Sequence, residues 1–406
     1  MKLDTKYWLK LSIVNLFIVG FLGALMRYKI GFIFPYFDQK HIQHAHSHFA
    51  FVGWITQTLF VLIVNFIQNK VPLVYYKQYK FLLIANLVCA YGMLISFAFQ
   101  GYGFISISFS IITIVVACIF ASYFFKDFKK MELSSTNVLW FKSALWFNII
   151  SSIGTFYLVY IMASKNFDEK WYLAAVYFFL HFQYNGFFIF TCLGLVQDKI
   201  QNVLPSFKNN NTIFKLFFIS FIPSYFLSTL WANLPIWLYL IVVLAALLQI
   251  VAWVKLVINI KASLPSNIYL TKLMLNLFFV VGIAFSIKLL LQLGSTIPAV
   301  SDLAFGFRPI VIAYLHLVLL AVISVFLLAY MYSFNLISKN KLSVFSLIAF
   351  VIGVFINEIV LCVQGIASFS YFSIPRINEM LFGISILLLF SLLFLVIAQF
   401  KSSAND

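Results

Sequence analysis

Apolar stretches of about 20 residues recur along the whole chain, and they constrain its fold more than any other feature. An α-helix of this length crosses roughly 30 Å of hydrocarbon. The composition agrees, since 64% of the 406 residues are hydrophobic and 9% are charged. A backbone in lipid must satisfy its own hydrogen bonds, which restricts spanning segments to helices or closed barrels. We therefore expect an all-α, polytopic integral membrane protein.

Twelve spans are predicted from this pattern. They cover residues 7–28, 46–68, 80–101, 103–125, 138–164, 171–197, 212–231, 235–260, 269–293, 308–334, 342–366 and 377–400. The loops between them are short, and neither a linker nor a sequence repeat is evident, so we expect a single transmembrane domain over residues 1–406. No cleavage-site pattern follows the first stretch, which favours a retained first helix.

Lysines gather in the loops that follow the even-numbered spans. Lys70 and Lys77 follow the second span, and Lys126, Lys129 and Lys130 follow the fourth. Cytoplasmic loops carry such an excess of basic residues, so we expect both termini to be cytoplasmic. The same loops explain the formal charge of +16 without a nucleic-acid partner. We expect membrane lipid, and no nucleic acid, to surround the chain.

The six histidines are unevenly placed. Four fall within eight residues at the start of the second span, while His181 and His316 lie inside later apolar stretches. Imidazole is the commonest side-chain ligand of transition metals and a frequent ligand of haem iron. His48 begins the second span at the outer face, and His316 lies about 12 Å into the tenth at 1.5 Å per residue. These compatible depths predict that His48 and His316 are the two axial ligands of one haem.

The neighbours of His48 leave alternatives open. His46 is the second choice on this helix, and it points about 200° away from His48, so both cannot face one iron. The outermost pair, His41 and His44, is interpreted as interfacial and solvated by headgroups. A different interpretation takes all four as a copper or zinc site of a membrane metal-handling protein.

The sixth span carries four polar side chains near mid-membrane depth: His181, Gln183, Tyr184 and Asn185. Polar groups at this depth rarely face lipid. They are expected either to line a cavity or cofactor site, or to hydrogen-bond neighbouring helices. His181 is a candidate metal ligand, and both His181 and Tyr184 are candidate catalytic residues.

Three further kinds of residue are singled out. Tyr314 lies on nearly the opposite face of the tenth span from His316, so two sides of that helix could serve two sites. Arg308 and Arg376, near the outer ends of two spans, could pair with haem propionates or extend to lipid headgroups. Glu358, a carboxylate deep in the eleventh span, is a candidate for proton exchange or for ligation, and a protonated, hydrogen-bonded acid is the alternative.

The chain resembles the catalytic subunits of haem–copper oxidases and nitric oxide reductases, including their NnrS-type relatives. The resemblance covers the whole chain in helix count and is confined to short motifs at residue level. His46-Ser47-His48, with Gly53 five residues later, is similar to the NnrS-type opening pattern. In the wider family the second helix carries a low-spin haem ligand where His48 stands, and the sixth carries a copper ligand where His181 stands.

The tenth and twelfth spans resemble the family in part. The family has a His-x-His on the tenth helix, and Tyr314-Leu315-His316 keeps only its second histidine. Pro375-Arg376 resembles half of a propionate-binding Pro-Arg-Arg motif. The seventh span, around Ile222–Tyr225, lacks the two histidines that would complete a copper site. The resemblance therefore implies a haem, with copper as a possible cofactor whose ligand set is incomplete.

These observations set the functional expectations. We expect a haem of b type, since no Cys-x-x-Cys-His is present. The role would be respiratory electron transfer or redox chemistry on O2 or NO, with a possible redox partner subunit, in a bacterial-type plasma membrane. An oxidoreductase activity stays open. The second interpretation is a transporter, which twelve spans would suit, and the third is the metal-handling protein.

Overall fold

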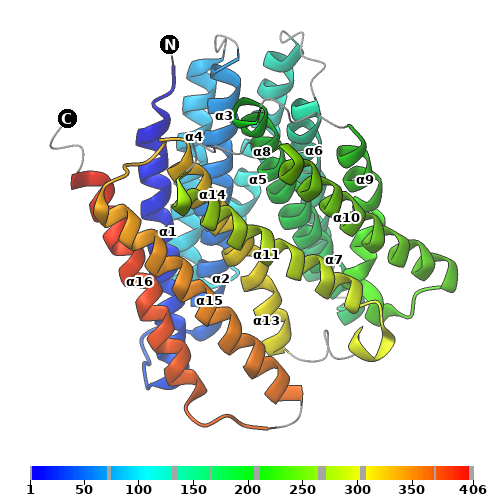
Figure 1. Ribbon diagram of the computed structural model, residues 1–406. Helices are drawn as coiled ribbons and strands as arrows, with labels where there is room; N and C mark the ends of the chain where they lie inside the picture. The colour runs from blue at the N-terminus through cyan, green and yellow to red at the C-terminus, as the bar shows by residue number, and fades with distance from the viewer. Residues whose placement is uncertain are drawn as a thin grey trace. The chain divides into compact units, whose positions relative to one another are not determined.

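The computed structural model describes residues 2–70, 75–129, 136–164, 167–204, 211–263, 271–301, 308–369 and 372–401, and over these residues it contains helices and no strand (Figure 1). Twelve helices in this part are long and apolar enough to cross a membrane. They run, for example, over Thr5–Gly31, Lys341–Ser368 and Ile377–Lys401, close to the predicted ranges. The all-α prediction and the number of apolar spans are confirmed.

The chain divides into two compact units, residues 1–131 with 324–406, and residues 132–323. The first contains α1 (Thr5–Gly31), α2 (Gln39–Phe49), η1 (Ala50–Thr56), α3 (Gln57–Gln68), α4 (Tyr76–Gln100), α5 (Phe104–Lys129), α14 (Val325–Ser333), α15 (Lys341–Phe369) and α16 (Ile377–Lys401). The second contains α6 (Thr136–Ser164), α7 (Glu169–Leu180), η2 (His181–Phe188), α8 (Ile189–Val203), α9 (Asn211–Phe221), η3 (Pro223–Ala232), α10 (Ile236–Ser263), α11 (Lys272–Gly294), α13 (Arg308–His316) and nearly all of η4 (Leu317–Ser324).

Helix α2 begins at Gln39, earlier than the predicted start of the second span at 46. The Asp38 carboxylate accepts hydrogen bonds from the backbone N–H groups of Lys40 and His41, at 2.8 and 3.0 Å. An aspartate at this position satisfies N–H groups that the first helical turn leaves unpaired. The whole histidine run therefore lies on the helix, with each side chain fixed in direction.

Three of the described spans change to π-helix partway along. The segments are η1 after His46 and His48, η2 beginning at His181, and η4 directly after His316. These second, sixth and tenth spans are also the most buried, over 83%, 78% and 50% of their most apolar windows, against 22–44% for the others described. A π-helical turn is rare and is found frequently at functional sites.

Packing within each unit brings particular helices to these segments. In the first unit, α1 and α4 both pack against α2 and η1, while α16 lies along α1 (Figure 1). In the second unit, α6 packs against α7, η2 and α8, and α9 packs against α10. Segment η1 therefore packs against α1 and α4, and η2 packs against α6 and α7.

Candidate functional site

His46 and His48 contact different neighbours. The Nδ1 atom of His46 lies 3.2 Å from the carbonyl oxygen of Val19 in α1. The His48 ring stacks on Phe97 of α4, with centroids 4.3 Å apart, and its Nε2 lies 3.3 Å from the hydroxyl of Tyr102. The prediction that the two imidazoles point apart is confirmed.

The partners also distinguish the two rings chemically. The Val19 carbonyl can only accept, so Nδ1 of His46 carries the proton and the lone pair lies on Nε2. Metal-bound histidines use this arrangement, in which a backbone carbonyl fixes the ring and its tautomer. Nε2 of His48 instead faces the Tyr102 hydroxyl, which can donate or accept. Local hydrogen bonding therefore favours His46 as an iron ligand, whereas the sequence favoured His48.

His41 and His44 pack on the turn between α4 and α5. The His44 ring centroid lies 4.6 Å from that of Tyr102, and a Cβ at Gly101 would lie 2.6 Å from the His41 ring. Gly101 has a φ of +61°, which glycine adopts without strain. In the described residues no three His, Cys, Asp or Glu side chains gather closely enough to hold a metal ion. The four-histidine copper or zinc site finds no support there.

Side chains from two neighbouring helices donate hydrogen bonds to backbone carbonyls of η1. Asn15 Nδ2 donates to the Gly53 carbonyl at 2.6 Å. Asn86 Nδ2 donates to the Val52 carbonyl at 3.2 Å and to Gln57 Oε1 at 2.8 Å. A π-helical turn displaces carbonyls from their usual partners, and a buried carbonyl without a partner is costly. Helices α1 and α4 therefore stabilise the irregular segment that follows His46 and His48.

His181 is fully buried, and both of its ring nitrogens are engaged. Nε2 lies 3.0 Å from the Phe221 carbonyl oxygen, and Nδ1 lies 3.2 Å from Asn185 Nδ2. Because the carbonyl only accepts, Nε2–H donates to it, and the Nδ1 lone pair accepts from the amide. The chain leaves the α-helical pattern at Pro223, two residues after Phe221. His181 therefore joins η2 to the break between α9 and η3.

The rest of the polar cluster in η2 is also tied to other helices or buried. Gln183 Nε2 donates to Asn148 Oδ1 and to Ser151 Oγ in α6, both at 2.8 Å. Tyr184 is 3% exposed and lies within electrostatic range of the half-buried Tyr314. Of the two interpretations of this cluster, hydrogen bonding between helices is confirmed. A copper ion would need the His181 lone pair that Asn185 already occupies, so this donor set does not fit copper.

His316 repeats the arrangement of His46. Its Nδ1 lies 2.9 Å from the carbonyl oxygen of Ile312, one turn earlier in α13. The proton therefore lies on Nδ1 and the lone pair on Nε2. This tautomer fits the requirement of a haem axial ligand. His46 lies in the first unit and His316 in the second, so their sharing of one haem stays a prediction.

Lys288 in α11 was not identified from the sequence, although a lysine inside the predicted span 269–293 was the available signal. It is 2% exposed, and its Nζ lies 5.5 Å from the centroid of the Phe285 ring. Its charge lies within electrostatic range of His181. Two buried acceptors of this unit, Asn185 Oδ1 and Gln292 Oε1, have no hydrogen-bond partner among the described residues.

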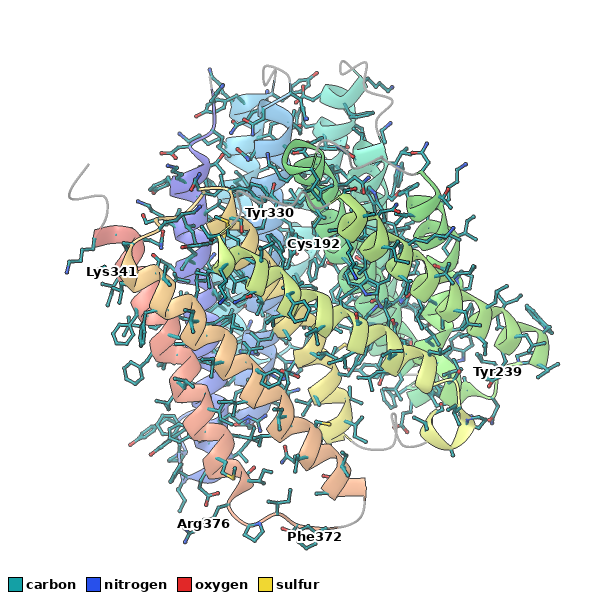
Figure 2. All side chains as sticks on the ribbon, in the orientation of Figure 1. Cys192, Tyr239, Tyr330, Lys341, Phe372 and Arg376 are labelled. Atoms are coloured by element: carbon teal, nitrogen blue, oxygen red, sulfur yellow. The ribbon has the colours of Figure 1, made fainter. Side chains whose placement is uncertain are left out.

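The structure does not bring the remaining predicted site residues close to one another. Glu358 is half-buried in α15, where its Oε1 accepts from Asn357 Nδ2 at 3.2 Å. Arg376 is exposed in the turn before α16, with a φ of +57° (Figure 2). The side chain of Arg308 lies outside the described residues. Pairing of either arginine with a propionate stays a prediction.

Comparison with models of protein families and with curated proteins gives no match to this chain. The resemblance to haem–copper oxidases therefore depends on the motifs and on the number of spans. What the structure adds is local: two histidines in a tautomer that suits iron, one histidine committed to structural hydrogen bonds, and an unexpected buried lysine.

Proposed function

We propose that the protein binds a b-type haem in the membrane through His316 and one histidine of α2. One observation carries this proposal. His46 and His316 each direct Nδ1 to a backbone carbonyl, at 3.2 and 2.9 Å, and each lies seven residues into its span, after Gln39 and Pro309 respectively. Both spans are even-numbered and enter from the same face, so both imidazoles lie about 10 Å deep at 1.5 Å per residue.

The residues of the chain would hold and tune such a group. A bound haem supplies a one-electron redox couple. The carbonyls of Val19 and Ile312 fix the two rings and raise the basicity of Nε2. Ile42, Ala45 and Phe49 of α2 are buried, and such packing would limit the access of water, which influences the potential of the iron. Electron transfer, or redox chemistry on O2 or NO, is the function that this arrangement supports best.

His181 has a different role in this proposal. Its two hydrogen bonds support a structural function at the break between α9 and η3. The protein then works without a three-histidine copper centre, and Tyr184, Tyr314 and Glu358 are not needed as ligands.

The visible spectrum of the purified protein tests the proposal. Reduction with dithionite should give sharp α and β bands, and His316→Ala should abolish them. His46→Ala should do the same if His46 is the second ligand, while His48→Ala should retain them; the reverse result would assign His48. His41→Ala is the matched control, because that ring packs on Gly101 at the end of the histidine run. A purified wild-type protein without haem would refute the proposal.

The colour of the wild-type protein also separates the other two interpretations. Colourless protein that retains copper or zinc would favour a metal-handling function. A colourless, metal-free protein would favour a transporter, for which Lys288 and Glu358 are the supporting residues, since ionisable groups within spans often mark a substrate or ion path.

A further inference from the structure

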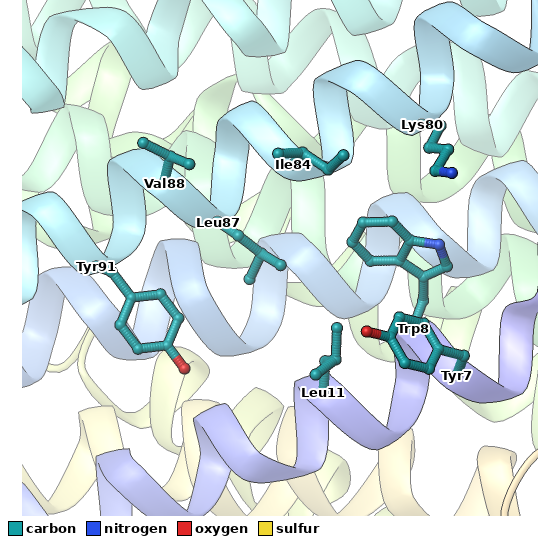
Figure 3. A pocket seen from close by; sticks show the side chains of 8 residues that line it. All are labelled: Tyr7, Trp8, Leu11, Lys80, Ile84, Leu87, Val88 and Tyr91. Carbon is teal, nitrogen blue, oxygen red and sulfur yellow. The ribbon is translucent and has the colours of Figure 1, made fainter.

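A groove of about 600 Å³ opens on the first unit between α1 and α4 (Figure 3). Lys80, Trp8 and Tyr7 lie together at one end of it, and Tyr91 lies at the other. Its middle is aliphatic and includes Ile84 and Val88, which are 44% and 57% exposed. The groove therefore has a cationic and aromatic end, an apolar middle and a second end lined by a tyrosine.

The length of this groove matches one leaflet of a bilayer. Lys80 and Tyr91 are eleven residues apart on α4, about 16 Å along the helix axis at 1.5 Å per residue. Half of a hydrocarbon core of roughly 30 Å is about the same length. Helices α1 and α4 are the first and third spans of the chain, so they cross the membrane in the same direction and begin at the same face. Lys80, in the second turn of α4, lies near that face.

The shallow end has the chemistry of a headgroup region. Tyr and Trp concentrate where hydrocarbon meets water. Lys80 is the cation that lines the groove, and two more exposed lysines, Lys6 and Lys77, lie in the first turns of the same two helices. A phosphodiester carries the opposite charge, and each lysine near a membrane surface contributes about 1 kcal/mol of attraction to an anionic lipid.

We infer that this groove binds one anionic phospholipid of the leaflet in which α1 begins. The phosphate lies against Lys80 beside Trp8, and one acyl chain runs along Ile84 and Val88 towards Tyr91. This inference is independent of the proposed haem, because no histidine borders the groove.

The deep end of the groove connects the lipid to η1. The Tyr91 hydroxyl donates to Asn15 Oδ1 at 2.8 Å, and Asn15 Nδ2 donates to the Gly53 carbonyl of η1 at 2.6 Å. The Tyr91 ring also meets Phe49, at 5.2 Å between centroids. An acyl chain against Tyr91 would therefore support the residues that hold this π-helical segment.

Native mass spectrometry of the full chain, stripped of lipid and mixed with defined lipid micelles, tests the inference. Phosphatidylglycerol should bind the wild-type protein about fivefold more tightly than phosphatidylcholine with the same chains. Lys80→Gln should remove most of this preference. Lys341→Gln is the matched control, an exposed lysine in the first turn of α15 of the same unit, and it should keep the preference.

Two further measurements distinguish the contribution of the lipid headgroup from that of its acyl chain. Val88→Trp, which fills the groove, should weaken binding of both lipids, with thermal unfolding of that variant checked against wild type. Inorganic phosphate should not displace the lipid. Equal binding of the two lipids, an unchanged preference in Lys80→Gln, or displacement by inorganic phosphate would each overturn the assignment.

Discussion

At the scale of single residues, a histidine inside a spanning helix is defined by what its two nitrogens contact. His181 uses one nitrogen to donate to the Phe221 carbonyl and the other to accept from Asn185. His46 and His316 each direct Nδ1 to a carbonyl, which leaves Nε2 as the nitrogen with the lone pair. The three imidazoles lie in similar apolar sequence, and their hydrogen bonds give them different chemistry.

The surroundings of Lys288 likewise decide its effect on the stability of the protein. It is buried in α11 beside the Phe285 ring, with no ion pair to it among the described residues. Burial of an uncompensated charge costs stability. Lys288→Met, which keeps the side-chain length, should raise the free energy of unfolding by at least about 1 kcal/mol. Denaturant or thermal unfolding of the purified protein measures this.

Lys272→Met provides the control for that experiment, because Lys272 is exposed at the first turn of the same helix and its removal should change little. A loss of stability in Lys288→Met would contradict the prediction, and would indicate that Lys288 holds a stabilising anionic partner.

At the scale of elements, irregular helical segments depend on side chains from their neighbours. Segment η1 has its Val52 and Gly53 carbonyls paired with Asn86 and Asn15 from two other helices. Segment η2 is joined to its neighbours by its own side chains, since Gln183 donates to Asn148 of α6 and His181 donates to the Phe221 carbonyl of α9. A π-helical turn in an apolar span is therefore a property of the packed unit more than of its own residues.

Removal of one of these partners should be costly. Asn15→Leu leaves the buried Gly53 carbonyl without its donor, and we expect a loss of about 1–3 kcal/mol in the free energy of unfolding. Ser122→Ala, which removes an exposed hydroxyl that donates to the Cys118 carbonyl of its own helix, is the control and should be close to neutral. Unchanged stability in Asn15→Leu would mean that η1 does not need this contact.

The cap of α2 should make the start of this helix sensitive to acid. Hydrogen bonds from the backbone N–H groups of His41 and Lys40 hold the pKa of Asp38 below its ordinary value of 3.8. The pKa of Asp38 is lower in the folded protein than in the unfolded chain. The Asp38 carboxylate therefore stabilises the start of α2 fully well above pH 3.8, and this stabilisation is lost as the pH falls through the folded pKa. Hydrogen exchange at the amides of residues 40 and 41 should accelerate over that range.

Asp38→Asn separates titration from capping. Asparagine caps helices about as well as aspartate and does not titrate, so the variant should protect the same amides with no dependence on acid. Equal acid sensitivity in the variant and the wild-type protein would remove Asp38 as the cause.

At the scale of the whole molecule, the three π-helical segments recur every four spans, in the second, sixth and tenth. Each is preceded or opened by a histidine, although no sequence repeat is evident over the same interval. What repeats is therefore the π-helical backbone and a histidine beside it. A comparison of the sequences of these spans does not detect such a repeat.

The orientation of the spans is the remaining prediction at this scale. Lysines in the loops after even-numbered spans should keep those loops cytoplasmic. A fluorescent protein joined after Ser333 or Lys401 should fluoresce, and alkaline phosphatase joined after Gly294 should be active. Activity of the phosphatase after Ser333 would contradict the orientation, and the predicted depths of the histidines would then refer to the other face.

The sequence by itself determined the helical class, the number of apolar spans and most of their limits, because hydrophobic length is a local property. The second span is the exception, since the polar histidine run hides its start at Gln39. It also indicated that His46 and His48 point apart, since helical geometry fixes that angle. Only the tertiary structure decided that His181 donates to Phe221, that Asn15 holds Gly53 and that Lys288 is buried. The two hydrogen bonds join residues distant in the chain, and the burial of Lys288 depends on which helices cover α11. A local pattern carries no information about the partners that packing supplies.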